Sequence, residues 1–330
     1  MSLKDTKYSV LDLVPVLEGK TPADSFERTV ELAQHAERLG YTRYWMAEHH
    51  NMPAIASSAT AVAISHVAHH TSTIRVGSGG VMLPNHAPLV IAEQFGTLAT
   101  LFPNRIDLGL GRAPGTDQMT AQALRRDLNS RAEEFPNQLE ELRNYFEGKN
   151  IIHAVPGEGL DVPIWLLGSS GFSAQLAGRL GLPFSFASHF SPNNTHGALN
   201  LYRSSFTPSD VLEAPHAMLG VNVVAADTDE EAEKLATSQQ QAFLNLVRNT
   251  KNLLQPPVDD MDEVWTPGEK AALQQQLGAS IVGSKETVRR KLEAFQAETD
   301  ADELMIVSQI YDQEARLHSY QLVSDIMNGK

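Results

Sequence analysis

The chain of 330 residues contains no cysteine. This excludes disulfide bonds, thiolate metal sites and a cysteine nucleophile. Basic residues are also scarce, because 26 lysines and arginines stand against 40 aspartates and glutamates, for a formal net charge of −14. A nucleic-acid-binding protein needs a basic face to neutralise phosphates, so the composition argues against that class.

Long apolar runs are missing as well. The run Tyr8–Val16 follows a polar start, is too short to span a bilayer and lacks the layout of a signal peptide. With 42% hydrophobic residues, the chain can nevertheless bury a large core. We therefore expect a soluble, cytoplasmic protein with neither a membrane nor a nucleic acid as its partner.

Short apolar segments alternate with amphipathic helical patterns along the chain. The segments predicted as strands are Tyr8–Leu13, Thr42–Ala47, Ile74–Leu83, Arg105–Leu110, Val162–Leu167, Pro183–Ala187, His216–Ala226 and Glu303–Val307. Such alternation favours a parallel sheet covered by helices, and eight strand–helix units favour a closed barrel. We predict an α/β fold, with one (β/α)₈ TIM-type barrel domain spanning residues 1–330.

The segment Asn249–Gly278 interrupts this rhythm between the seventh and eighth predicted strands. It contains prolines, a cluster of acids and few apolar residues, and it is longer than a normal barrel connection. Long loops in compact domains are usually lids or disordered. The segment is therefore a candidate lid insertion that we expect to be weakly ordered, with a passive surface insertion as the alternative.

In barrel enzymes the active site lies at the carboxyl ends of the strands. After the second predicted strand come Glu48, His49 and His50. Two imidazoles and a carboxylate at a strand end suit acid–base chemistry near neutral pH, although an ordinary polar loop is the alternative. We predict that these three residues are catalytic.

A metal site is the competing interpretation of the histidines. Catalytic zinc needs about three spaced protein ligands, whereas adjacent histidines point to different sides of an extended chain. His66, His69 and His70 have helical spacing, but they lack the HExxH pattern and suit the last turn of a helix. We therefore predict no metal.

Glycines in the third predicted strand suggest that something approaches its backbone. Gly79 and Gly80 would weaken a strand interior without such a neighbour. A flat ring system lying on the strand would explain both glycines, and tight barrel packing is the alternative.

Two strand ends suggest a phosphate. Arg112 follows the fourth predicted strand, although Gly109–Gly115 does not match a dinucleotide fingerprint. After the fifth strand, Ser169, Ser170 and Gly171 precede Ser173 at the start of a predicted helix, where backbone N–H groups can bind an anion. A plain helix cap is the alternative for these serines, but together with Arg112 they indicate a phosphorylated ligand.

These motifs, in this order, resemble the bacterial luciferase-like flavin-dependent monooxygenases. The matching stretches are Ala47–His50, Arg75–Pro84, Asn104–Arg112, Asn129–Arg131 and Gly168–Pro183. The resemblance extends over nearly the whole chain and is clearest between residues 47 and 188.

The resemblance assigns roles to individual residues. It implies that Arg112, Arg131, Ser170 and Ser173 hold the phosphate of FMN. It also implies that Gly79–Gly80 is the site of a non-proline cis peptide bond beneath the flavin ring, and that His49 and His50 lie at the reaction site.

The function that the resemblance implies is oxidation of a small organic substrate by reduced FMN and O₂. A separate flavin reductase would supply the reduced flavin, and we expect a homodimer. Gly111 stands where true luciferases carry a cysteine, so we do not expect light emission. The alternatives are an F420-dependent oxidoreductase of the same fold, whose longer acidic cofactor wants more basic groups, and a non-catalytic flavin-binding protein.

Overall fold

The computed structural model describes residues 2–113, 117–124 and 134–330. Its strands that form a closed ring are β1 (Lys7–Asp12), β2 (Arg43–Met46), β3 (Arg75–Met82), β4 (Ile106–Gly111), β5 (Ile164–Gly168), β6 (Phe184–Phe186), β7 (Ala217–Ala226) and β9 (Glu303–Val307). Neighbouring strands pair in parallel, and pairing of β6 with β7 and of β9 with β1 closes the ring. The predicted eight-stranded barrel is confirmed.

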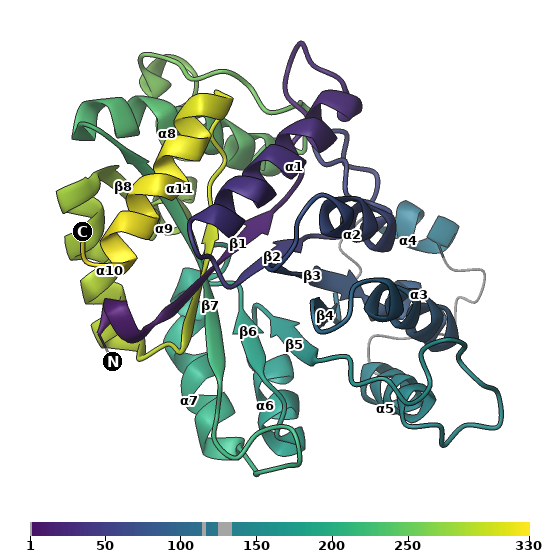
Figure 1. Cartoon of the computed structure of the whole chain (residues 1–330). Coiled ribbons are helices and arrows are strands. Elements are labelled where there is room, and N and C mark those ends of the chain that lie inside the picture. The colour runs from purple at the N-terminus through teal and green to yellow at the C-terminus, as the bar shows by residue number, and fades with distance from the viewer. Residues whose placement is uncertain (1, 114–116, 125–133) are drawn as a thin grey trace.

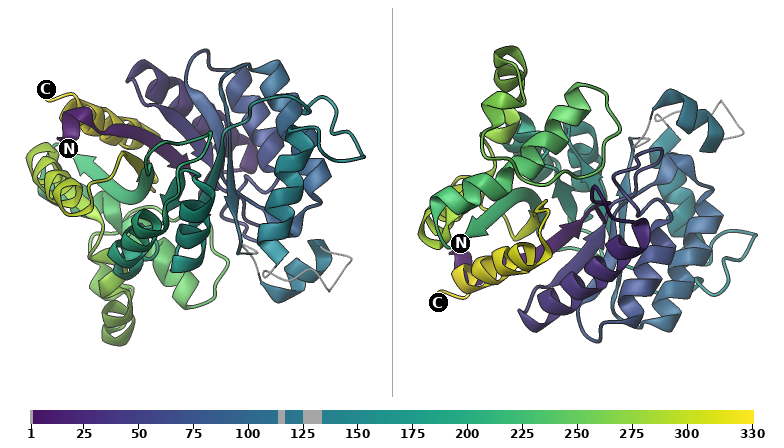
Figure 2. Two further views of the ribbon diagram at one scale, coloured as in Figure 1. Left: turned by 90° about the horizontal axis from the view of Figure 1, so that it is seen from below. Right: turned by 90° about the horizontal axis from the view of Figure 1, so that it is seen from above.

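Helices surround the barrel on all sides (Figures 1 and 2). They are α1 (Pro22–Arg38), α2 (Thr60–His69), α3 (Pro88–Leu101), α4 (Gln118–Leu124), α5 (Phe135–Phe146), α6 (Gly171–Leu180), α7 (Thr195–Ser205), α8 (Asp229–Val247), α9 (Pro267–Leu277), α10 (Lys285–Thr299) and α11 (Gln313–Met327). Within the described ranges, no helix is both long and apolar enough to cross a membrane.

A ninth strand, which the sequence pattern did not predict, lies outside the ring. Among the described residues, β8 (Ile281–Ser284) pairs only with the last four residues of β7, Val223–Ala226. It extends the sheet beyond the barrel and leads directly into α10. The eighth predicted strand is therefore β9 of the structure.

The segment Asn249–Gly278 is folded, so the expectation that it has little to bury is wrong. It contains a short 3₁₀ helix, Met261–Glu263, and α9, which Thr266 begins with a capping box. Met261 and Leu273 are buried against Phe243 of α8, and these apolar contacts fix the segment to the barrel. Whether part of it acts as a lid stays a prediction.

The barrel interior is layered along the strands, because alternate strand residues point inward. A middle layer is apolar and contains Leu11, Trp45, Trp165, Met218 and Met305. The two tryptophan rings meet edge to face with their centroids 5.4 Å apart. This layer separates a polar floor from the open carboxyl end of the barrel.

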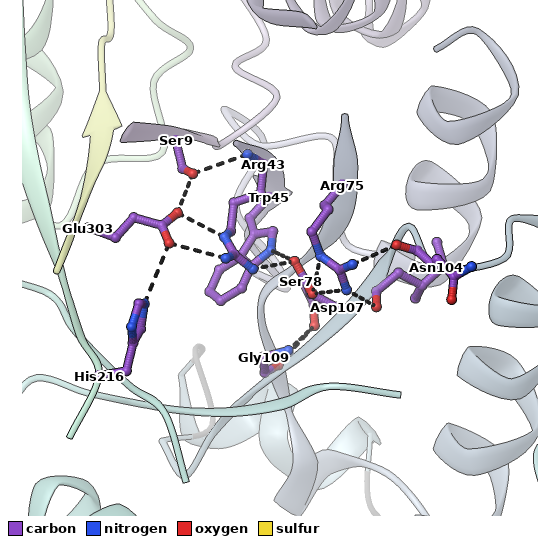
Figure 3. A network of polar contacts seen from close by, with 11 residues as sticks. Ser9, Arg43, Trp45, Arg75, Ser78, Asn104, Asp107, Gly109, His216 and Glu303 are labelled. Atoms are coloured by element: carbon purple, nitrogen blue, oxygen red, sulfur yellow. Dashed lines mark hydrogen bonds and ion pairs between the residues drawn. The ribbon is translucent and has the colours of Figure 1, made fainter. Parts of the chain in front are cut away.

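The floor is a network of buried charges on β2, β3, β4 and β9 (Figure 3). The Arg43 guanidinium donates to Asp107 at 2.7 Å and to both carboxylate oxygens of Glu303, at 2.8 and 3.1 Å. Arg75 and the indole N–H of Trp45 also donate to Asp107, at 2.9 Å from Arg75 Nε and 3.1 Å from the indole. Two arginines thus neutralise two carboxylates that have no access to water.

Glu303 is held ionised by this network. Burial alone would raise its pKa, but the charge of Arg43 and hydrogen bonds from His216, Arg43 and Ser9 outweigh burial and lower the pKa to about 2. An ionised carboxylate therefore contributes stability that depends on pH.

We expect Glu303→Gln to lower the free energy of unfolding by about 3 kcal/mol at pH 7, because it leaves the buried Arg43 undercompensated. The folded-state pKa is depressed, so the stabilisation is present above the usual pKa of 4.5 and is lost as the pH falls toward 2. Urea unfolding over this range should show a flatter pH profile for the variant than for the wild type.

The control is Glu286→Gln, which alters a carboxylate whose side chain is 87% exposed. It should change stability by less than about 0.5 kcal/mol. Parallel pH profiles for Glu303→Gln and the wild type would contradict the assignment of acid lability to Glu303.

Candidate functional site

A cavity of about 800 Å³ opens at the carboxyl end of the barrel. Its base is formed where the strands continue with small residues beyond the apolar layer, such as Ala47, Gly111 and Gly220. The predicted site residues that line it are His49, His50, Gly79, Gly80, Arg112, Ser169, Ser170 and Ser173. Residues far apart in sequence are thus brought together, as the strand-end argument predicts.

The remaining predicted site residues lie elsewhere. Glu48 is buried behind the cavity wall and contacts it through His50. Gly171 is the first residue of α6 and is not among the lining residues. Arg131 lies outside the described residues, so its predicted contact with a phosphate stays a prediction.

Glu48 joins two histidines. One carboxylate oxygen, Oε1, lies 2.9 Å from His50 Nε2 and 2.8 Å from His86 Nε2, and the other accepts from the Met82 amide at 3.2 Å. Burial alone would raise the pKa of Glu48, but the hydrogen bonds and charges of His86 and His50 outweigh it and lower the pKa. An ionised carboxylate only accepts hydrogen bonds, so each ring places its N–H on Nε2.

His86 was not among the predicted site residues; it follows β3 after the short 3₁₀ helix Leu83–Asn85. The signal that could have identified it is the one used for Glu48, namely a titratable residue just beyond a barrel strand. His86 was overlooked because three turn residues separate it from the strand.

His189, just beyond β6, was missed for the same reason and lines the cavity. Its ring packs directly on Gly220 of β7, where a Cβ atom would collide with it. Burial, followed by the charge of His49, lowers the pKa of His189 to about 4, so the ring is neutral at physiological pH. Its Nδ1 is buried without a hydrogen-bond partner among the residues that the structure describes.

Arg112 and the start of α6 form the cationic end of the cavity. The Arg112 guanidinium lies 4.1 Å from the ring centroid of Phe172, the second residue of α6. Ser170 occupies the N-cap position with an extended backbone, yet its side chain makes no capping hydrogen bond. The serine is therefore not a plain side-chain cap, and a cation beside exposed helix N–H groups is a favourable anion site.

Gly79 and Gly80 satisfy both interpretations that the sequence left open. They line the cavity, and a Cβ atom on Gly80 would lie 2.7 Å from the Gly109 carbonyl oxygen. The pairing of β3 with β4 shifts register here, between Ser78 and Val81, and the Gly79–Gly80 peptide bond is cis. The absence of side chains at Gly79 and Gly80 therefore allows β3 to pack closely on β4 and also leaves this part of the cavity wall open.

Gly111 lies close to Met82. A Cβ atom at this position would lie 2.8 Å from the sulfur of Met82. A larger side chain at position 111 would therefore require the flexible Met82 side chain to shift.

Another part of the cavity lining comes from the end of α8 and the first part of the insertion. Phe243, Leu246 and residues 249–254 line the cavity there. Leu254 forms a parallel bridge with Leu17. The Leu254 amide donates to the Val16 carbonyl and the Glu18 amide donates to the Leu254 carbonyl, both at 2.9 Å. The insertion is thus attached to the loop after β1 on the cavity side.

The three helical histidines lie outside this cavity. His66, His69 and His70 line a separate surface depression of about 560 Å³. There, His70 Nδ1 lies 2.8 Å from the His66 carbonyl oxygen, which engages that nitrogen with the backbone. Across the described part of the chain, metal-ligating atoms converge only at Glu48, His50 and His86.

Comparison with known proteins gives consistent matches over the full length. The model of one family, luciferase-like monooxygenase, matches residues 6–302. An uncharacterised *Bacillus subtilis* protein is 61% identical and an *Escherichia coli* luciferase-like monooxygenase 53% identical, each over 99% of this chain and 98% of the relative. A *Bacillus subtilis* N-acetyl-S-alkylcysteine monooxygenase is 35% identical over 97% of both chains.

Solved structures agree in fold. Apo-MsnO8 is 36% identical with a TM-score of 0.87, covering 97% of this chain and 98% of that one. The FMN complex of the oxygenating constituent of 3,6-diketocamphane monooxygenase from *Pseudomonas putida* is 17% identical with a TM-score of 0.75, over 100% and 99% of the two chains. An F420-dependent secondary alcohol dehydrogenase is 14% identical with a TM-score of 0.69, over 98% and 99%.

Proposed function

This chain belongs to the luciferase-like monooxygenase family, and we propose that it is an FMN-dependent monooxygenase acting on a small organic substrate. The observation that carries the proposal is a single cavity lined both by an anion-binding site, formed by Arg112 and the start of α6, and by a group of histidines. The first suits a phosphate and the second suits proton handling.

The cavity residues fit FMN. Arg112, Ser170, Ser173 and the N-terminal amides of α6 would hold the phosphate, together with Arg131. Gly79–Gly80 presents backbone without side chains, which leaves room for a flat ring. A volume of about 800 Å³ lies within the range of small-molecule sites.

FMN is favoured over F420 by charge. The described lysine and arginine side chains that line the cavity are Arg112 and Lys251. The longer acidic tail of F420 wants more basic groups than this, and the likeness to an F420-dependent enzyme is one of fold.

Reduced FMN bound here would supply the activation of O₂. The chain supplies the proton handling: ionised Glu48 holds His50 with its N–H on Nε2, which leaves Nδ1 as the nitrogen that can accept a proton. Glu48 is a positioning residue in this scheme, and His49 and His50 are the catalytic residues.

The substrate would occupy the part of the cavity that the flavin leaves open. Apolar Phe243 and Leu246 and polar His189 and Asn222 are among the residues that line the cavity. This mixture suits a compound with an apolar body and a polar group. Because one relative is an N-acetyl-S-alkylcysteine monooxygenase, thioethers of that class are the first compounds to test.

We propose two partners. A separate flavin reductase would supply reduced FMN, because Gly109–Gly115 does not match the fingerprint for a dinucleotide. A second copy of this chain would form a homodimer, as is usual for the family.

We expect Arg112→Ala to weaken FMN binding about 10- to 100-fold, because it removes a charge-assisted contact worth about 1.5–3 kcal/mol. Fluorescence titration measures this directly. Arg179→Ala, at the other end of α6, is the matched control and should leave the affinity unchanged. Riboflavin, which lacks the phosphate, should bind wild type and Arg112→Ala alike.

Equal FMN affinity for Arg112→Ala and the wild type would contradict the proposal that Arg112 binds the FMN phosphate. Tighter binding of F420 than of FMN by the wild type would instead favour the deazaflavin alternative. The two outcomes are separate, because the first compares variants and the second compares cofactors.

We expect His50→Ala to keep FMN affinity within a few-fold but to lower product formation by about 100-fold or more, the range for loss of an acid–base group. With a flavin reductase, NADH and a thioether substrate, the variant should release more H₂O₂ per O₂ consumed. His318→Ala, which alters a surface histidine paired with Asp227, is the control.

If His50→Ala forms product and releases H₂O₂ at the wild-type ratio to O₂ consumed, the catalytic role is contradicted, and Glu48, His49 and His50 belong to an ordinary polar loop. If the wild type binds FMN but consumes no O₂ with any reductase, the chain is a non-catalytic flavin-binding protein.

A further inference from the structure

We propose that Glu48, His50 and His86 form a binding site for Zn²⁺, and that a bound ion switches off the proposed monooxygenase. Metal binding follows from the geometry of the three side chains alone. The inhibitory effect rests on the proposed function, because it requires His50 to act in the reaction.

The donor atoms are already close together. Glu48 Oε1 lies 2.9 Å from His50 Nε2 and 2.8 Å from His86 Nε2, and the ligand atoms of the three residues all lie within 4.8 Å of one another. Zinc binds nitrogen and carboxylate oxygen at about 2.0–2.2 Å, which puts tetrahedral ligands about 3.3 Å apart. Each nitrogen–oxygen pair therefore needs to open by only about 0.5 Å.

The ligand set is the one that zinc uses when it keeps an open position. Two imidazoles and one carboxylate occupy three sites of a tetrahedron and leave the fourth for water. The Met82 amide donates to Glu48 Oε2 at 3.2 Å, so the second carboxylate oxygen orients the first.

An ion can reach the site. The Glu48 side chain is only 2% exposed, but those of His50 and His86 are 14% and 27% exposed. His50 also lines the main cavity, which connects the site to solvent. The carboxylate is thus shielded, while both histidine side chains are partly exposed.

The pair of residues that starts the site is Glu48 and His50, not the adjacent His49 and His50. Glu48 and His50 are two residues apart, and their side chains meet at 2.9 Å. His86, brought from the loop after β3, supplies the third ligand.

The metal-bound and hydrogen-bonded states exclude each other. In the hydrogen-bonded state each ring carries its proton on Nε2 and donates it to Glu48. A metal ion needs the lone pair on Nε2 of each ring, so it replaces both hydrogen bonds to Glu48. His50 is then held by the ion and no longer by its hydrogen bond to Glu48, which is the reason for inhibition.

The test uses Co²⁺ as a spectroscopic substitute for Zn²⁺ on the full chain after treatment with EDTA. We expect one Co²⁺ per chain with the visible absorption of four- or five-coordinate cobalt, displaced by Zn²⁺. His86→Ala and the isosteric Glu48→Gln should lose the signal. His69→Ala, which disrupts the surface histidines, is the matched control and should keep it.

Circular dichroism of each variant shows whether it is folded, so that loss of the cobalt signal has a single meaning. A wild type without the signal, or a signal lost in His69→Ala and kept in His86→Ala, would overturn the site. Full turnover of the wild type with Zn²⁺ bound would overturn the inhibitory role and leave the site standing. Since the cobalt spectrum needs no turnover, failure of the proposed function is distinguishable from failure of the site.

Discussion

The ion pairs of the buried Arg43 guanidinium are the interactions on which the interior of the barrel depends. Arg43 lies on β2, and it joins Asp107 of β4 to Glu303 of β9, although neither strand is a neighbour of β2 in the sheet. A charge in this position is tolerable because the carboxylates of Asp107 and Glu303 lie directly against it, at 2.7 and 2.8 Å. The charged floor and the apolar layer above it fill the amino-terminal part of the barrel, and the cavity is left to the other end.

The position of the cavity follows from side-chain size along the strands. Trp45 and Trp165 fill the middle of the barrel, and the next inward positions carry small residues such as Gly111 and Gly220. The empty volume therefore begins directly above the tryptophans. Functional groups need not lie inside the strands, because side chains from the loops at this end all face the same space.

Much of the site could be predicted from sequence, because a strand end in a parallel barrel fixes where the next side chains lie. That rule placed His50, Arg112 and Ser170 around one cavity. It did not find His86 and His189, which reach the site from positions further along their loops, where no periodicity constrains the direction of a side chain. The insertion was misjudged for a related reason: its buried Met261 and Leu273 are sparse in sequence, and their partner Phe243 lies on another element.

Glu48 shows why the chemistry of the site could not be inferred from residue types alone. As a member of a Glu-His-His run it predicts acid–base chemistry, and in the structure it also contacts the imidazole of His86, which lies outside the run. The same carboxylate can accept two N–H groups or share a metal ion with two nitrogens, and the difference lies in where two protons sit. Because the two states use the same nitrogen atoms, an ion bound here would compete with the hydrogen bonds that His50 and His86 make to Glu48.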